Sequence, residues 1–274
     1  MYEAFYGLQA KPFSILPNPH LIYWGRMHRL AYAMLEFGVL NQAGFTVITG
    51  EIGSGKTTLI HHLLSKLPNG VTPGLINNTP QGRDELLRWI MLAFGQAIEG
   101  EYLIVFRRFQ EFLLDHLRGK RTAILVIDEA QNLGLESLEF LRMLSNINTT
   151  ETPVLQLILV GQPQLREQLR DPILEQFAQR VAVDFHLKAL EEKEVAGYIE
   201  SRLSAAGARR QIFADQAIAV VAKKSRGIPR IINILCDTAL VYGLATQAHV
   251  ITPDIVEEVI ADRQTYGVLP IGNV

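Results

Sequence analysis

Apolar and polar positions follow two different periodicities along the first two-thirds of the chain. Short runs of apolar residues predict buried strands. These strands are expected at Phe45–Thr49, Val71–Asn77, Ala123–Ile127, Leu155–Val160 and Val181–Phe185. Longer stretches between them have apolar residues at intervals of three and four positions, which predicts helices. The helical stretches are Thr57–Leu67, Asp84–Ile98, Leu103–Leu117 and Leu135–Leu144. Strands that alternate with helices are typical of an α/β fold with a mostly parallel sheet.

The pattern changes near Leu190, after which only helical periodicity remains. The helices predicted there are Glu192–Ala205, Asp215–Lys224, Pro229–Ala245 and Pro253–Arg263. Turn signals at Gly207, Gly227 and Thr252-Pro253 separate them. We therefore expect an α/β domain over residues 1–188, a small all-helical domain over residues 189–265 and a C-terminal tail over residues 266–274.

The composition is that of a soluble globular protein. Of the 274 residues, 48% are hydrophobic and 20% are charged, and the formal net charge is -2. These values exclude the disordered and collagen-like classes. No apolar run approaches the roughly 20 residues that a membrane-spanning helix needs, and the N-terminus lacks the features of a secretory signal. Because the single cysteine, Cys236, excludes an internal disulfide, we expect a cytoplasmic location.

The clearest motif is a glycine-rich loop between the first predicted strand and the helix after it. Residues Gly50, Glu51, Ile52, Gly53, Ser54, Gly55, Lys56 and Thr57 fit the pattern G-x-x-x-x-G-K-[ST]. Glycines allow a backbone conformation that brings N–H groups close to phosphate oxygens, and the helix directs its positive end at the same anion. We expect this loop, with Thr58, to bind ATP. Lys56 would neutralise the β- and γ-phosphates and Thr57 would ligate Mg2+; the alternative is an ordinary turn that enters a helix.

An acidic pair, Asp128 and Glu129, follows the third predicted strand. A carboxylate at the end of a strand beside a phosphate loop can hold Mg2+, which prefers oxygen ligands. We assign that role to Asp128, and we expect Glu129 to polarise the water that attacks the γ-phosphate. The alternative is that the pair only begins a loop or caps the next helix.

The chain resembles the AAA+ ATPases, and among them the general secretion pathway protein A, or ExeA-type, family. The resemblance covers nearly the whole chain. Besides the loop and the acidic pair, it rests on Phe5-Tyr6-Gly7-Leu8, Lys11-Pro12-Phe13-Ser14, Pro17-Asn18-Pro19, His28-Arg29 and Gly44-Phe45. It implies a P-loop AAA+ core, with a parallel five-stranded sheet sandwiched by helices, followed by a small all-helical lid domain.

The resemblance also implies further site residues. Gln162, after the fourth predicted strand, would sense the γ-phosphate, although Gly161-Gln162-Pro163 also reads as an ordinary turn. Arg180 resembles the arginine finger that reaches the γ-phosphate of a neighbouring subunit, a role suited to a permanently charged guanidinium. The alternative for Arg180 is a surface arginine before a strand.

Two more residues take roles from the same resemblance. Arg230, in Gly227-Ile228-Pro229-Arg230, is similar to the second sensor of the lid domain. Its alternative is a simple helix start, because proline is favoured in the first turn. Asn77, at the end of the second predicted strand, would restrain Glu129 until a partner binds. The seven histidines show no metal-ligand spacing, and we expect them to be packing or surface residues.

We therefore expect an ATPase that forms a homo-oligomer through the arginine finger and remodels or assembles a partner complex. The resemblance implies a protein partner in secretion or in envelope or exopolysaccharide export, and a cytoplasmic protein held peripherally at the inner membrane by that partner. A DNA-bound transposition regulator of the TniB or MuB kind, which binds duplex DNA and recruits a transposase, is the alternative. The near-neutral charge and the N-terminal motifs favour the first interpretation. The intact acidic pair argues against a scaffold with little turnover.

Overall fold

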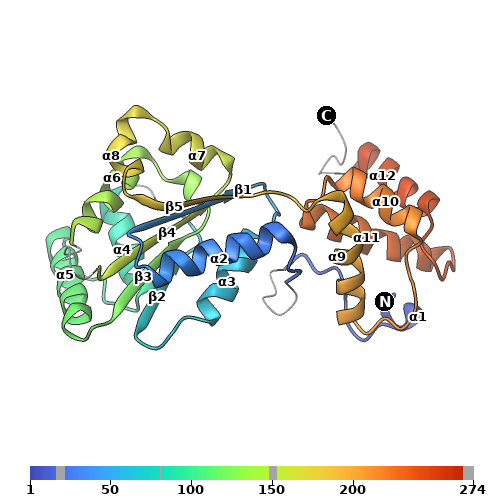
Figure 1. Ribbon diagram of the computed structural model, residues 1–274, viewed down its shortest axis with the longest axis horizontal. Helices are drawn as coiled ribbons and strands as arrows, with labels where there is room; N and C mark the ends of the chain where they lie inside the picture. Colours follow the sequence, from blue (N-terminus) through green and yellow to red (C-terminus); the bar gives the residue numbers. More distant parts are fainter. Residues whose placement is uncertain (17–21, 81, 148–152, 268–274) are drawn as a thin grey trace. The chain divides into compact units, whose positions relative to one another are not determined.

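The computed structural model describes residues 1–16, 22–80, 82–147 and 153–267. It divides into two compact units (Figure 1). The α/β unit comprises Leu30–Gly50 and Leu59–Leu187. The helical unit comprises Met1–Arg29, Glu51–Thr58 and the described residues from Lys188 onward.

The α/β unit contains one five-stranded sheet, and all five predicted strands are present. The strands are β1 (Phe45–Gly50), β2 (Val71–Ile76), β3 (Thr122–Ile127), β4 (Leu155–Gly161) and β5 (Val181–Leu187). Their order is β2-β3-β4-β1-β5, and every pair is parallel. The carboxyl ends of β1, β4 and β3 therefore lie side by side at one edge of the sheet. The predicted α/β fold class is confirmed.

Helices accompany the strands of this sheet. They are α2 (Arg26–Leu40), α3 (Lys56–Ser65), α4 (Arg83–Ala93), α5 (Tyr102–Arg118), α6 (Leu135–Leu144), α7 (Pro163–Leu169) and the short α8 (Glu175–Ala178). The predicted helix over Asp84–Ile98 is shorter than expected, because Gly95 adopts φ +67° directly after it. The N–H of Gln96 then bonds the Met91 carbonyl at 2.8 Å, a bonding pattern that closes a helix. The sequence prediction named no helix before the phosphate loop, where α2 lies.

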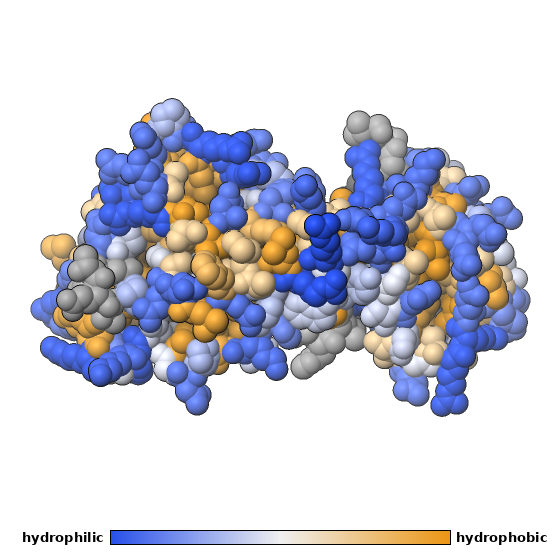
Figure 2. All heavy atoms as spheres, viewed as in Figure 1, coloured by the Kyte–Doolittle hydropathy of each residue, from blue (hydrophilic) through white to orange (hydrophobic). Residues whose placement is uncertain are grey.

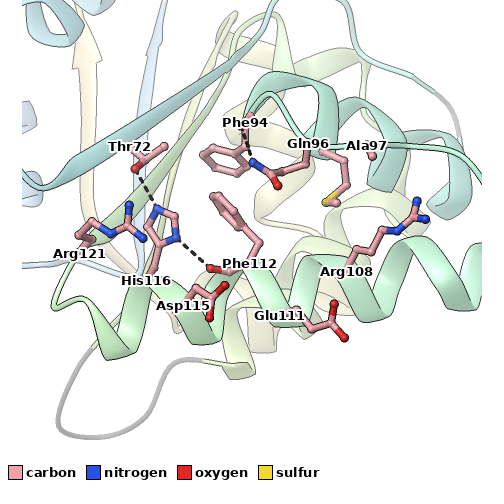
Figure 3. A pocket seen from close by; sticks show the side chains of 11 residues that line it. Thr72, Phe94, Gln96, Ala97, Arg108, Glu111, Phe112, Asp115, His116 and Arg121 are labelled. Atoms are coloured by element: carbon pink, nitrogen blue, oxygen red, sulfur yellow. Dashed lines mark hydrogen bonds between the residues drawn. The ribbon is translucent and has the colours of Figure 1, made fainter.

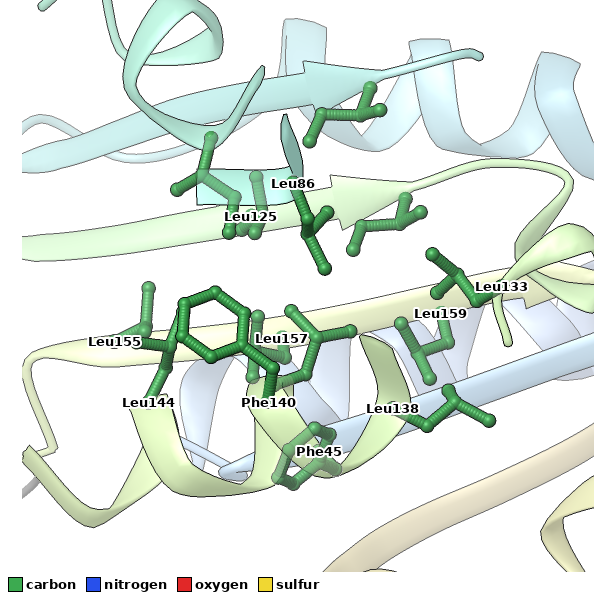
Figure 4. Close-up of a cluster of buried hydrophobic side chains, with 14 of the residues drawn as sticks. Phe45, Leu86, Leu125, Leu133, Leu138, Phe140, Leu144, Leu155, Leu157 and Leu159 are labelled. Carbon is green, nitrogen blue, oxygen red and sulfur yellow. The ribbon is translucent and has the colours of Figure 1, made fainter. Parts of the chain in front are cut away.

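The core of the α/β unit forms where alternate strand residues meet the helices. Successive side chains of a strand point to opposite faces, so Leu155, Leu157 and Leu159 of β4 share one face. Figure 4 shows these leucines beside Phe140 of α6, and all four residues are buried. On β1, Phe45 belongs to the same cluster. The continuous apolar runs of the sequence are thus explained by burial of both faces.

The helical unit is built from four helices that match the four predicted ones. They are α9 (Glu192–Ala205), α10 (Asp215–Ser225), α11 (Pro229–Ala245) and α12 (Pro253–Tyr266). The N-terminal segment, with the short helix α1 (Glu3–Tyr6), packs into the same core. Tyr6 and Phe13 are each 1% exposed, and the carbonyl of Pro12 accepts a bond from Arg202 at 2.8 Å. This segment, which the sequence prediction groups with the α/β domain, thus belongs to the helical unit.

One face of α2 is apolar and exposed. Leu30, Phe37 and Leu40 are 46%, 55% and 74% exposed, and their spacing places them on one side of the helix. Figure 2 shows apolar side chains at the surface where α2 lies in Figure 1. Within the described ranges, no helix combines the length and apolar composition that a membrane crossing requires.

Candidate functional site

The glycine-rich loop joins the end of β1 to the start of α3. Gly53 and Gly55 have φ values of +80° and +99°, a region that only glycine adopts without strain. The Lys56 ammonium donates a hydrogen bond to the Glu51 carbonyl at 3.0 Å, and this lysine is only 6% exposed. The lysine side chain therefore folds back onto the loop, and Lys56 is also the first residue of α3. Such an arrangement suits an anion.

Ser54, which belongs to the loop, and His28, which precedes the loop in the chain, form a buried polar pair. His28 Nε2 donates to the Ser54 carbonyl at 2.9 Å, which leaves Nδ1 as the acceptor of a neutral ring. Among the described residues, neither His28 Nδ1 nor Ser54 Oγ has a hydrogen-bond partner, although both are buried. Burial lowers the pKa of His28 below its ordinary value of 6.5, while the Ser54 carbonyl and Glu194 oppose that shift. A phosphate oxygen is a suitable partner for the Ser54 hydroxyl.

The sequence prediction treated His28 as a packing or surface residue, and the structure places it against the phosphate loop. A Cβ atom at Gly55 would lie 3.1 Å from His28 Nε2. His28 precedes Ser54 by 26 residues. No local periodicity links the two positions. The sequence pointed to His28 only through the His28-Arg29 pair, one of the motifs on which the family resemblance rests.

The first turn of α11 contacts the same loop. Arg230 N–H donates to the Gly53 carbonyl at 3.2 Å. A Cβ atom at Gly53 would lie 2.4 Å from the Cβ atom of Arg230, so a side chain there cannot be accommodated without movement. Arg230, predicted as the second sensor, is therefore at the phosphate loop within the helical unit. Its side chain is exposed.

The acidic pair lies at the carboxyl end of β3 in the α/β unit. Asp128 is 5% exposed, and its N–H donates to the Ile76 carbonyl at 2.8 Å. Its Oδ1 accepts the N–H of Glu129 at 2.8 Å. Glu129 itself has φ +52°, a left-handed conformation that is uncommon for a residue with a side chain. The chain therefore turns sharply at this glutamate.

Two glutamine side chains hold the carboxylate of Glu129. Its Oε2 accepts from Gln131 Nε2 at 2.6 Å and from Gln162 Nε2 at 3.1 Å. The structure thus brings the predicted sensor Gln162 to the predicted base. Asn77, predicted to restrain Glu129, is exposed, and the side-chain donors described for this carboxylate are the two glutamines instead. No motif in the sequence pointed to Gln131.

Arg180 lies between α8 and β5 and is half-buried. Its guanidinium donates to Ser145 Oγ at 2.6 Å and to the Arg142 carbonyl at 3.3 Å. Both acceptors lie at the C-terminal end of α6, where the helix dipole favours a cation. The arginine is therefore anchored by its own chain.

A metal would find oxygen donors but no cage of protein ligands. The described residues contain no group of three or more His, Cys, Asp or Glu side chains arranged to hold a metal ion. Mg2+ usually binds through one or two carboxylates together with substrate phosphates and waters. The hydroxyl of Thr57 and the carboxylate of Asp128 are each, by their chemistry, donors of the kind that Mg2+ takes.

A separate cavity of about 460 Å³ lies beside α4, α5 and β2 (Figure 3). None of the predicted site residues lines it. Its buried histidine, His116, donates from Nδ1 to the Phe112 carbonyl at 2.9 Å and accepts from the Thr72 hydroxyl at 2.8 Å. Both ring nitrogens are therefore satisfied within the protein.

The chain is similar to a known domain family and to a longer known protein. The AAA domain family matches residues 40–169. General secretion pathway protein A of Aeromonas hydrophila is 38% identical over 251 residues, which cover 91% of this chain and 46% of that protein. The chain therefore spans less than half the length of this relative.

Solved structures show the same fold at low sequence identity. The ADP form of the Aeropyrum pernix ORC2 protein has a TM-score of 0.63 at 18% identity, covering 89% of this chain and 69% of that one. Drosophila ORC bound to DNA has a TM-score of 0.70 at 15% identity, covering 95% and 65%. The Thermotoga maritima RuvB Holliday junction branch migration motor has a TM-score of 0.56 at 19% identity, covering 90% and 73%.

Proposed function

Because the chain belongs to the AAA+ family of P-loop proteins and is related over most of its length to general secretion pathway protein A, we propose that it binds ATP with Mg2+ and hydrolyses the ATP to ADP and phosphate. The observation that carries this proposal is the glycine-rich loop wrapped around the buried ammonium of Lys56. A lysine at the start of a helix, in a loop whose glycines can direct backbone N–H groups at an anion, suits a phosphate.

The loop residues from Gly50 to Thr58 would bind the phosphates, with Lys56 against the β- and γ-phosphates. Mg2+, when bound, would neutralise charge on the phosphate oxygens. Thr57 and Asp128 are the residues that would hold it. The unpartnered hydroxyl of buried Ser54 supports the presence of a ligand with acceptor oxygens at the loop.

Hydrolysis needs a base and groups that respond to the γ-phosphate. Glu129 would accept the proton of the attacking water, a role supported by its half-buried carboxylate at the end of β3. Gln162 would sense the γ-phosphate, and Arg230 would couple the helical unit to the phosphate state through its contact with Gly53.

Self-association would complete the site. Arg180 would reach the γ-phosphate of a neighbouring copy, a role that suits a permanently charged guanidinium held in one orientation by Ser145. The exposed apolar face of α2 supports contact with another protein, since such faces are typical of interaction surfaces.

The cellular role that we propose is the assembly or remodelling of a protein complex in secretion or in envelope or exopolysaccharide export. The relative from Aeromonas hydrophila supports this class. In that role the protein would be cytoplasmic and held at the inner membrane by its partner.

A second candidate is a DNA-dependent ATPase of the transposition-regulator class. Arg209, Arg210 and Lys223 are exposed in the helical unit and would supply cations for duplex phosphates. The DNA-bound Drosophila structure shares the fold, but its 15% identity carries no more than that.

One experiment addresses both candidates. We would measure the steady-state ATP hydrolysis rate of the purified chain at low salt, with and without duplex DNA, and compare it with the rate of Lys56→Ala. Hydrolysis that Lys56→Ala abolishes supports the ATPase proposal, and a rate equal to that of the variant rejects it. Strong stimulation by DNA that weakens as salt rises would favour the second candidate.

A further inference from the structure

We propose that Gln131 is a positioning residue that, together with Gln162, orients the carboxylate of Glu129 so that Oε2 is anchored and Oε1 receives the proton of the attacking water. This inference rests on the proposed ATPase function, in which Glu129 is the general base. It adds a residue to the site and assigns separate tasks to the two oxygens of one carboxylate.

The first step is the backbone at the end of β3. Glu129 adopts φ +52° and ψ +36°, and the short 3-10 helix η2 (Ala130–Asn132) follows immediately. This turn brings Gln131, two residues later, within hydrogen-bond distance of the Glu129 side chain. The arrangement is local to the segment, but it does not by itself fix the direction of the glutamine.

The second step is that both ends of the Gln131 amide are engaged. Nε2 donates to Glu129 Oε2 at 2.6 Å, and Oε1 accepts the backbone N–H of Gln162 at 3.0 Å. A carboxylate only accepts and a backbone N–H only donates, so these two bonds together fix the orientation of the amide. Gln131 therefore links the end of β3 to the end of β4.

The third step is the asymmetry of the Glu129 carboxylate. The amides of Gln131 and Gln162 both donate to Oε2. In the described part of the chain, no hydrogen bond is formed by Oε1, and this atom is not among the buried unpartnered atoms. A general base works best when another group orients it and one lone pair faces the proton to be abstracted. The geometry meets that requirement.

The fourth step is the packing around Gln131. A Cβ atom at Gly161 would lie 2.9 Å from Gln131 Oε1 and 2.8 Å from Leu165 Cδ2, so the glycine leaves the space in which the amide lies. Gln168 Nε2 donates to the backbone carbonyl of Gln131 at 3.0 Å. The side chain and the backbone of Gln131 are thus both held by β4 and the helix after it.

The test compares Gln131→Met with wild type, because methionine has a similar length and cannot donate to the carboxylate. We expect kcat for ATP hydrolysis to fall about 10-fold, which is less than the roughly 10²–10⁴-fold that a general base contributes, because Glu129 itself is still present. KM and the Kd for ATP should change little, because Gln131 acts on the Glu129 carboxylate and not on the nucleotide. Tm should stay close to that of wild type, because methionine fills a similar volume. Gln211→Met is the matched control: Gln211 also donates to a carboxylate, Asp215 at 2.8 Å, on the exposed surface of the helical unit.

Two further variants separate positioning from a structural effect. Gln131→Glu keeps the polar shape but presents an oxygen to Oε2, and it should lower kcat in the same way. Gln162→Met combined with Gln131→Met should lower kcat by less than the product of the separate effects, because both act through Glu129. Multiplicative effects, or a loss of kcat that follows a loss of Tm, would overturn the proposal.

The outcomes also separate this inference from the proposed function. If wild type hydrolyses ATP no faster than Glu129→Gln, the proposed function fails and the inference fails with it. If wild type is active, Glu129→Gln is inactive and Gln131→Met matches wild type, only the inference fails.

Discussion

Arg230 and Gly53, separated by most of the chain, are joined by a hydrogen bond from the arginine N–H to the glycine carbonyl at 3.2 Å. The two residues are so close that a Cβ atom at Gly53 would lie 2.4 Å from that of Arg230. The first turn of α11 and the phosphate loop therefore meet through backbone and Cβ atoms. The Cδ and Cγ atoms of the arginine side chain lie beside the same Cβ position, at 3.1 and 3.3 Å.

Gly53→Ala should abolish ATP binding, because the added methyl group meets Arg230 and the φ of +80° is strained for alanine. Equilibrium binding of a fluorescent ATP analogue measures the effect. Gly70→Ala is the matched control, since Gly70 has φ +93° but open space around its Cβ position. Normal ATP binding by the Gly53 variant would contradict the close packing of Gly53 against Arg230.

Lys56→Ala should abolish nucleotide binding, whereas Glu129→Gln should bind ATP normally and stop its hydrolysis. The lysine supplies the buried cation of the loop, and the glutamine cannot accept the proton of the water. Loss of a general base costs on the order of 10²–10⁴-fold in rate. Binding titrations and phosphate release distinguish the two defects, and normal turnover by Glu129→Gln would remove the glutamate from the mechanism.

Arg180→Ala should keep ATP binding and lose turnover. Mixing it with Glu129→Gln should restore part of the hydrolysis, because one interface between the two proteins then carries both intact residues. Phosphate release from the mixture, compared with each variant alone, is the measurement. An inactive mixture from two proteins that still associate would argue for action of Arg180 within its own chain.

Ser145→Ala is a companion to the Arg180 variant. It removes the hydroxyl that accepts from the guanidinium at 2.6 Å and leaves the charge in place. We expect a smaller loss of turnover than for Arg180→Ala, with unchanged ATP binding. Equal losses for the two variants would mean that the serine has a role beyond holding the arginine.

The helical unit should lose stability as the pH falls below about 6.5, because burial lowers the pKa of His28 in the folded chain. Below 6.5 the unfolded chain binds the proton first, so the free energy of unfolding decreases until the lower folded pKa is passed; above 6.5 the contribution is fully present. His28→Gln, which keeps a donor for the Ser54 carbonyl, should reduce this dependence. The measurement is the free energy of unfolding of both proteins, from urea unfolding at about pH 7.5 and about pH 5.5. An equal change in this free energy for the two proteins would contradict the prediction.

Much of the fold and part of the site are encoded locally. The five strands follow from apolar runs, and α6, α9 and α11 have their predicted bounds, because periodicity reflects which faces are buried. The phosphate loop is also a local property: its glycines, its lysine and its hydroxyl residue stand at fixed spacing between a strand and a helix. Asp128 and Glu129 follow from their place directly after a buried strand.

Tertiary structure decided the relationships between residues far apart in the chain. Tyr6 and Phe13 bury in the core of the helical unit, and His28 lies against Ser54, although no period connects these positions. Gln131 acquires its place only because β3 and β4 are neighbours in the sheet, which brings the Gln162 N–H to its amide. Spacing along a chain specifies local backbone and burial, whereas the partners of a polar side chain depend on which elements pack together, and that is settled only when the whole chain folds.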